Sequence, residues 1–314
     1  MTKTSQSIIG FVGLVLLGIS GAAILASLKS TTELIRPVHL FVTLTDTRPQ
    51  NQGNVEQGQL PSNTLRSAWS RDGYTFTLDE QHWLTSDDMA DPSISVNDEG
   101  IWVVASGTGH DALRGTASSL CPSFDAFPEV IQGGGIPDVM TTDNGFRIYY
   151  SGDGGILSAF SADGTSFAKE QGVRLPTPDW LNLIADPTVT QRTDGTYVMY
   201  FKGTTTITTT PYEHSMYRAT SSDGLVWSAE NDVLIEHASV PGAYTDASGR
   251  VWIYYLNFGA GWPNERESVW ATYETADGDL VTPKAVTFTT ELPDYLWVND
   301  PDPVMIPTSL DLNT

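Results

Sequence analysis

The sequence predicts an all-β protein, a five-bladed β-propeller, and two repeated patterns carry this prediction. In the first, a proline lies eight residues before a turn glycine, and the prolines recur every 45 to 54 residues: Pro92/Gly100, Pro137/Gly145, Pro187/Gly195 and Pro241/Gly249. In the second, a Ser/Thr-x-Asp-Gly motif follows, as in SRDGYTF, SADGTSF and SSDGLVW. Repeats of about 50 residues that contain several short strands are typical of propeller blades.

Each repeat is expected to contain four strands. Segments such as FRIYY and YVMYF hold the β-branched and aromatic residues that strands favour. The Asp-Gly pairs predict hairpins, because both turn positions tolerate a positive φ angle. A fifth copy starts at Pro301, near the C-terminus. We therefore expect the last blade to join this C-terminal strand to N-terminal strands that begin near His39, Thr64 and Tyr74, which would remove exposed sheet edges.

An apolar run precedes the repeats. Residues 8–28 carry no charge and are numerous enough for a helix that spans a bilayer. The small residues that begin at Ser20 also fit the cleavage site of a signal peptide. We therefore divide the chain into residues 1–30, a signal peptide or hydrophobic membrane-anchor helix, and residues 31–314, the propeller. Both alternatives predict an extracytoplasmic protein, either secreted or attached to the membrane through this segment.

The composition excludes several classes of function. The net charge is −22, from 38 acidic and 16 basic residues, so the protein is expected to repel the phosphates of nucleic acids. The single cysteine, Cys121, rules out an intramolecular disulfide, and no Cys/His spacing indicates zinc. No G-x-S-x-G motif indicates a serine hydrolase. We predict no cofactor; Ca²⁺ suits acidic oxygen ligands, but no site is assigned to it.

Acidic residues lie where the first strand begins in every repeat except the fourth, and we expect them to converge on the propeller axis. Crowded carboxyl groups do not ionise independently, which is a requirement for acid–base chemistry on a glycosidic bond. An Asp-Pro pair can also be structural, since Asp accepts backbone N–H groups and Pro fixes the start of a strand. The acids are Asp91, Asp138, Asp186, Asp300 and Asp302.

Long connections on the same predicted face supply further candidates for substrate binding. Such loops on a rigid scaffold are common binding sites. The tryptophans could serve as platforms for sugar rings, and the charged and histidine side chains could bind hydroxyl groups. These candidates are His110, Trp180, Glu213, His214, His237, Trp262, Arg266 and Trp297.

With its Asp-Pro strand starts and SDGxxW/F hairpins, the sequence resembles the five-bladed propeller glycoside hydrolases, the arabinanase/xylosidase and invertase/fructanase superfamily, over about residues 37–307. The hairpins are also similar to sialidase Asp-boxes, one residue shorter. The resemblance implies that Asp91 is the general base or nucleophile and that Asp186 tunes pKa values and contacts the sugar. The fourth repeat reads SVPGAY and has no acid at its strand start, so Glu236 just before it, or Glu213, is the candidate general acid.

The predicted function is that of an extracytoplasmic glycoside hydrolase-like propeller, which acts on a glycan through axial carboxylates with retention or inversion. Its catalytic residues would be Asp91, Asp186 and Glu236. The alternative is a non-catalytic propeller that binds carbohydrate or protein at the cell surface. The missing acid in the fourth repeat favours this alternative.

Overall fold

The computed structural model describes residues 37–46, 63–86, 89–107, 112–118, 129–206, 213–259, 268–294, 296–307 and 310. The chain divides into two units, Met1–Pro37 and Val38–Thr314, and all the strands among the described residues belong to the second. The predicted hydrophobic helix at residues 8–28 and Cys121 lie outside the described residues. Among the helices of the described part, none is long and apolar enough to cross a membrane.

The described part of the unit that starts at Val38 holds five sheets, numbered 1 to 5 from the sheet that contains β4. Sheet 1 holds β4 (Ser93–Val96), β5 (Trp102–Gly107), β6 (Ala112–Ser118) and β7 (Glu129–Gln132). Sheet 2 holds β8 (Gly135–Thr142), β9 (Gly145–Gly152), β10 (Gly155–Ser161), β11 (Ala168–Lys169) and β12 (Leu175–Pro176). Sheet 3 holds β13 (Leu183–Gln191), β14 (Tyr197–Thr204), β15 (Ser215–Ser221), β16 (Ser228–Ala229) and β17 (Ile235–Glu236). Sheet 4 holds β18 (Ala238–Thr245), β19 (Val251–Asn257), β20 (Ser268–Glu274) and β21 (Lys284–Ala285). Sheet 5 holds β23 (Leu296–Val304), β1 (Val38–Asp46), β2 (Asn63–Ser70), β3 (Thr75–Ser86) and β22 (Thr287–Phe288).

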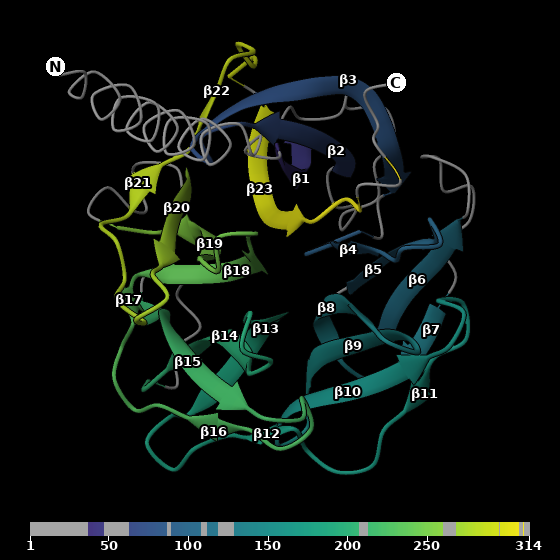
Figure 1. Cartoon of the computed structure of the whole chain (residues 1–314), viewed down its shortest axis with the longest axis vertical. Helices are drawn as coiled ribbons and strands as arrows, with labels where there is room; N and C mark the ends of the chain where they lie inside the picture. The colour runs from purple at the N-terminus through teal and green to yellow at the C-terminus, as the bar shows by residue number, and fades with distance from the viewer. Residues whose placement is uncertain are drawn as a thin grey trace, which may run out of the picture. The chain divides into compact units, whose positions relative to one another are not determined.

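The sheets stand around a common centre, with the first strand of each sheet nearest to it (Figure 1). These first strands contact one another in order: β4 with β8, β8 with β13, β13 with β18, β18 with β23, and β23 again with β4. In sheet 5 the C-terminal strand β23 pairs antiparallel with the N-terminal strand β1, as the sequence predicted. The predicted all-β, propeller-like architecture is confirmed.

The repeated Asp-Gly motifs form tight hairpins. In the first of them, the Oγ atom of Ser70 accepts a hydrogen bond from the Gly73 N–H group at 2.9 Å. The Asp72 carboxylate accepts the N–H groups of Tyr74 and Thr75 at 2.8 and 2.7 Å. The same bonds recur around Asp163 and Asp223. These aspartates are therefore turn residues, as predicted, and the Oδ1 atom of each accepts N–H groups of the local backbone.

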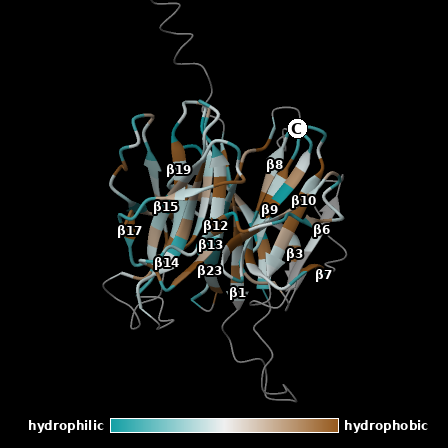
Figure 2. Cartoon of the chain, turned by 90° about the horizontal axis from the view of Figure 1, so that it is seen from below, coloured by the Kyte–Doolittle hydropathy of each residue, from teal (hydrophilic) through white to brown (hydrophobic). Residues whose placement is uncertain are grey.

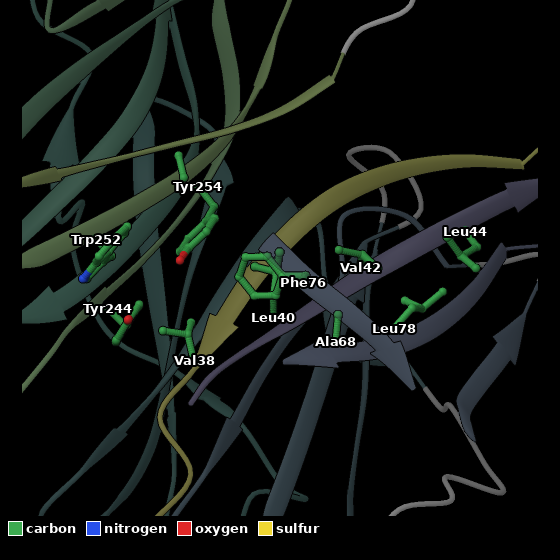
Figure 3. Packing of buried hydrophobic residues seen from close by; sticks show 11 residues of the cluster. Val38, Leu40, Val42, Leu44, Ala68, Phe76, Leu78, Tyr244, Trp252 and Tyr254 are labelled. Carbon is green, nitrogen blue, oxygen red and sulfur yellow. The ribbon is translucent and has the colours of Figure 1, made fainter. Parts of the chain in front are cut away.

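The core lies between neighbouring sheets. Strand β1 shows why, because alternate side chains point to opposite faces of a strand. Val38, Leu40, Val42 and Leu44 pack with Tyr254 and other residues of sheet 4 (Figure 3). Phe41 points the other way and packs against Trp83 and Trp102, in the cluster shared with sheet 1. Because both faces are buried, this strand has apolar residues on both of them. Hydrophobic positions are frequent along the other strands too (Figure 2).

Side chains at one repeat position join the first strands around the centre. This position directly follows the repeat proline, and its side chain accepts a backbone N–H group from the next sheet. The bonds are Ser93 Oγ with Val139 N at 3.0 Å, Asp138 Oδ2 with Val189 N at 2.9 Å, Thr188 Oγ1 with Ala243 N at 3.0 Å, and Asp302 Oδ2 with Ile94 N. The remaining contact, from sheet 4 to sheet 5, has Gly242 at this position.

Gly242→Ala is expected to lower the free energy of unfolding by at least about 1–3 kcal/mol through overpacking. A Cβ atom at Gly242 would lie 2.2 Å from the carbonyl oxygen of Pro301 and 2.6 Å from Pro303 Cδ. Gly278→Ala is the comparison variant, since its Cβ would meet nothing within 4 Å and only its left-handed backbone, with φ of +85°, opposes the change. Urea unfolding measures both. Equal losses would contradict the close approach of sheets 4 and 5.

Candidate functional site

The residue before each repeat proline has an unusual backbone conformation. Asp91, Ile136, Asp186, Val240 and Asp300 have φ angles of 46°, 51°, 50°, 49° and 49°. Few residues other than glycine adopt this left-handed region; Asp does so more readily than Ile or Val. In β8, β13, β18 and β23 the strand register also shifts at this point. Such bulges redirect side chains, and these five residues line one cavity of about 20 Å³, roughly the space of one water molecule.

All five predicted axial acids line this cavity, but they occupy two different positions of the repeat. Asp91, Asp186 and Asp300 precede the proline, whereas Asp138 and Asp302 follow it and accept backbone N–H groups of the next sheet. Asp138 and Asp302 also line a second cavity of about 260 Å³, formed by the later parts of the first strands. These two acids therefore lie between the two cavities and join the sheets. Their predicted contact with a substrate stays a prediction.

Burial raises the pKa values of the two acids that follow the repeat proline, Asp138 and Asp302. It raises the pKa of Asp138 to about 7, against the opposing effect of the bond from Val189. Burial also raises the pKa of Asp302 well above its ordinary value, and the neighbouring charge of Asp138 adds to this effect. A carboxyl group that stays partly protonated near neutral pH avoids the large cost of a buried, unpaired charge.

Among the three acids that precede the repeat proline, Asp186 is the most deeply buried, with 1% of its surface exposed. Its Oδ2 atom lies 2.7 Å from the Lys202 ammonium group. The same oxygen accepts bonds from Ser239 Oγ at 3.1 Å and Val240 N at 3.3 Å. Its Oδ1 atom is buried without a hydrogen-bond partner among the described residues. Asp186 therefore has one oxygen in an ion pair and the other left to accept a ligand's hydrogen bond.

Asp91 and Asp300 are half-buried neighbours at the cavity. Burial and then the charges of Asp300 and Asp186 raise the pKa of Asp91 well above its ordinary value. Burial raises the pKa of Asp300 to about 6. Two carboxyl groups with raised pKa values therefore line the cavity together with Asp186.

The structure does not bring the two candidate general acids to the cavity lining. Glu236 is exposed on β17, where it pairs with Ser215 of β15. Glu213 is also exposed, and it accepts a hydrogen bond from Thr206 Oγ1. At the corresponding position of sheet 4 the cavity is lined by Val240. The general-acid role of Glu236 stays a prediction.

The other predicted binding residues are dispersed. Burial, and then the charge of Lys202, lowers the pKa of His214 to about 4, and its Nδ1 atom has no hydrogen-bond partner in the described part. Trp180 is 37% exposed and packs on Tyr217 with ring centroids 5.1 Å apart, so its ring is available as a platform. His237 and Trp297 are half-buried, and neither lines the small cavity. The remaining three, His110, Trp262 and Arg266, lie outside the described residues.

Two residues that the sequence analysis did not single out belong to the site. Lys202 directly follows the apolar segment YVMYF within β14, and a charged residue inside an otherwise buried strand was the signal that could have identified it. Ser239 occupies the repeat position of Ala90 and Ala185 and donates a bond to Asp186. Within the described ranges, no group of three His, Cys, Asp or Glu side chains could hold a metal ion.

Comparisons with known proteins agree with this architecture. No family model and no curated protein matches the sequence. Solved structures do match. An endo-1,4-beta-xylanase from Bacteroides thetaiotaomicron has a TM-score of 0.56 and 9% identity over 73% of this chain and 93% of its own. A xylan beta-1,4-xylosidase from Bacillus halodurans has a TM-score of 0.53 and 13% identity over 79% of this chain and 55% of its own.

An endo-arabinase from Bacteroides thetaiotaomicron has a TM-score of 0.51 and 13% identity over 74% of this chain and 90% of its own. The fold is similar to that of propeller glycoside hydrolases. At these identities the likeness concerns the fold and not the reaction.

Proposed function

We propose that this protein is a five-bladed propeller that acts on a glycan as a glycoside hydrolase, through carboxyl groups at its axis. One observation carries the proposal: Asp91, Asp186 and Asp300 reach a single cavity from three different sheets. Asp186 is paired with Lys202, whereas burial raises the pKa values of Asp91 and Asp300. Hydrolysis of a glycosidic bond needs carboxyl groups in different protonation states, and these environments favour such a difference.

The roles follow from position and charge. We propose Asp91 as general base or nucleophile, and Asp186, held by Lys202, as the charged group that contacts the sugar and tunes its neighbours. Glu236 is the proposed general acid. It lies on the segment that leads into β18, two residues before Ala238, and this short connection supports its approach to a bound substrate. Substrate contacts from the other predicted loop residues, with Trp180 as a sugar platform, belong to the same proposal.

The proposed substrate is a carbohydrate, and glycans that contain pentoses are the first to test. The xylanase, xylosidase and arabinase with similar folds are named for such substrates, which supports this choice. We also propose that the apolar segment at residues 8–28 directs the protein out of the cytoplasm, either as a cleaved signal peptide or as an anchor helix.

Asp91→Asn is expected to lower kcat/KM for hydrolysis of a pentose-containing oligosaccharide about 10³-fold, because the amide cannot take part in proton transfer or attack. Release of reducing ends from a panel of xylans, arabinans and aryl glycosides measures the activity. Asp194→Asn is the matched control, since Asp194 is exposed in the turn between β13 and β14 and bonds only within that turn in the described part. Wild-type activity in Asp91→Asn would contradict the assignment.

A non-catalytic carbohydrate-binding propeller is the second candidate. It is favoured by the absence of any glutamate among the described residues that line the axial cavity. Isothermal titration of the same oligosaccharides distinguishes the two candidates. Binding that Asp186→Asn abolishes, without release of reducing ends by the wild-type protein, would favour the binding function over hydrolysis.

A further inference from the structure

We propose that a second binding site lies on the propeller axis and takes one ring of an uncharged sugar. The site is the cavity of about 260 Å³ formed by the later parts of the first strands. Asp138 and Asp302 line both this cavity and the smaller one that Asp91, Asp186 and Asp300 reach. No step of the proposed hydrolysis uses the larger cavity, so the inference goes beyond the proposed function.

The first strands turn their free edges toward the larger cavity. Each of them is the terminal strand of its sheet, so its own sheet pairs with only one of its edges. At the residue two positions after the repeat proline, the backbone N–H group points away from that sheet and bonds to the neighbouring first strand. The residues with this bond are Ile94, Val139, Val189 and Ala243.

The next exposed position on each free edge follows from the pairing pattern. In an antiparallel strand, the backbone groups of alternate residues point to the same edge. The N–H groups of Asn97, Arg192 and Asp246 bond within their own hairpins. The residues just before them therefore direct both N–H and C=O groups toward the axis. With the equivalent residue of β8, these residues are Val96, Thr141, Gln191 and Thr245, and all four line the cavity.

The cavity wall thus offers both donors and acceptors of hydrogen bonds. Backbone groups at an unpaired edge need partners, which water or a ligand must supply. Side chains add to this supply, because Thr190 and Thr245 bond to each other from sheets 3 and 4, with their Oγ1 atoms 3.1 Å apart. One hydroxyl group of such a pair is the donor, and the other keeps its own proton for a ligand. Hydroxyl groups of a sugar can both donate and accept, as this wall requires.

The charges around the cavity disfavour other classes of ligand. The described residues that line it include no Lys, Arg or His, and the chain has a net charge of −22, so an anion would be repelled. Asp138 already accepts bonds with both oxygens, from Thr188 Oγ1 at 3.1 Å and Val189 N at 2.9 Å. Within the described ranges, no group of three acidic, His or Cys side chains could hold a metal ion. An apolar ligand would leave the backbone groups unpaired, which is costly.

The size of the cavity limits the ligand to about one sugar ring. Pockets for small molecules measure about 300–1,000 Å³, and this cavity lies just below that range. A pentose, with about ten non-hydrogen atoms, is expected to bind there with a Kd of about 1–10 mM. Pentoses are also what hydrolysis of the proposed substrates would release, so D-xylose and L-arabinose are the probes to use.

Met305→Trp is expected to raise the Kd for these pentoses at least about tenfold, because the indole ring takes space that the sugar needs. Met305 lines the cavity and is 40% exposed, so the substitution should leave the core intact. Titration calorimetry of the full chain measures the Kd. Met305→Leu is the matched control and should bind as the wild-type protein does. Equal Kd values for Met305→Trp and the wild-type protein would overturn the proposal.

Thr190→Val provides a second variant, which removes a hydroxyl group and keeps the shape of the side chain. Loss of one hydrogen bond should weaken pentose binding by about 2- to 10-fold. Thr193→Val is its control, since Thr193 is exposed in the turn after β13 and does not line the cavity. Thermal unfolding shows which variants are folded. An unchanged Kd in folded Thr190→Val would also contradict the site.

Asp186→Asn separates this site from the proposed catalytic one. It should abolish binding at the small cavity and leave a pentose bound in the larger one, whereas Met305→Trp should keep wild-type hydrolysis. A crystal structure of Asp186→Asn soaked in D-xylose shows where the sugar lies. An empty larger cavity in that crystal, or no pentose binding by the wild-type protein at about 50 mM sugar, would overturn the proposal. If no glycan is hydrolysed, the proposed function fails, but these binding measurements still decide whether the second site exists.

Discussion

Glu274→Ala is expected to lower the free energy of unfolding by about 3–5 kcal/mol, as is typical when one partner of a buried ion pair is removed. Glu274 ends β20 of sheet 4 with none of its surface exposed. Its carboxylate lies 2.6 Å from Arg218 and 2.8 Å from Arg192, which both belong to the sheet 3 repeat. The substitution leaves two guanidinium groups without this partner where sheets 3 and 4 meet.

Glu230→Ala is the matched control, because Glu230 binds the same Arg218 but has 41% of its side chain exposed. Water can replace an exposed carboxylate, so this loss should stay within about 0–1 kcal/mol. Urea unfolding monitored by tryptophan fluorescence measures both variants. Similar losses in the two variants would show that burial of Glu274 does not strengthen the contact between the sheets.

Lys202→Met should affect both stability and activity. The Lys202 ammonium group is the cation paired with Asp186, which is almost completely buried. Removing it leaves an uncompensated carboxylate in the interior, with an expected loss of about 3–5 kcal/mol. Hydrolysis should fall with it, because a charged Asp186 is part of the proposed reacting group. Thermal unfolding and reducing-end release on the folded fraction measure the two effects.

Lys202→Arg is the conservative comparison. It keeps the positive charge, although its planar guanidinium group fits a lysine site imperfectly. Stability should therefore recover more completely than activity. If Lys202→Met kept wild-type stability, the buried pair would not be compensated as the geometry indicates.

The repeat pattern was sufficient to predict the propeller-like architecture, because the residues that start each first strand and form each hairpin lie close together in the sequence. Proline fixes the start of each first strand, and Asp-Gly fixes the hairpins, so spacing alone located the sheets. The close approach at Gly242 could not be predicted in this way. It depends on Pro301, which lies far away in sequence but next to Gly242 in space.

The site was predicted in part. The five acids do reach one cavity, but the sequence did not distinguish the position before the proline from the position after it. The segment DPDP contains both, and only the backbone shows that Asp300 has a positive φ angle whereas Asp302 bonds to Ile94. The role of Lys202 was missed because its partner Asp186 lies on another strand. Which side chains pair across two strands depends on the register of those strands. The pattern of hydrophobic residues does not show which charged side chain of one strand lies opposite which residue of the next.

The most direct test of the central claim is a crystal structure of Asp91→Asn bound to an oligosaccharide that the wild-type protein cleaves. The account predicts a sugar ring at the axial cavity, with a hydroxyl group bonded to Asp186 Oδ1 and the scissile bond next to position 91. An oligosaccharide bound elsewhere on the protein, with the three aspartates making no contact with it, would contradict the account.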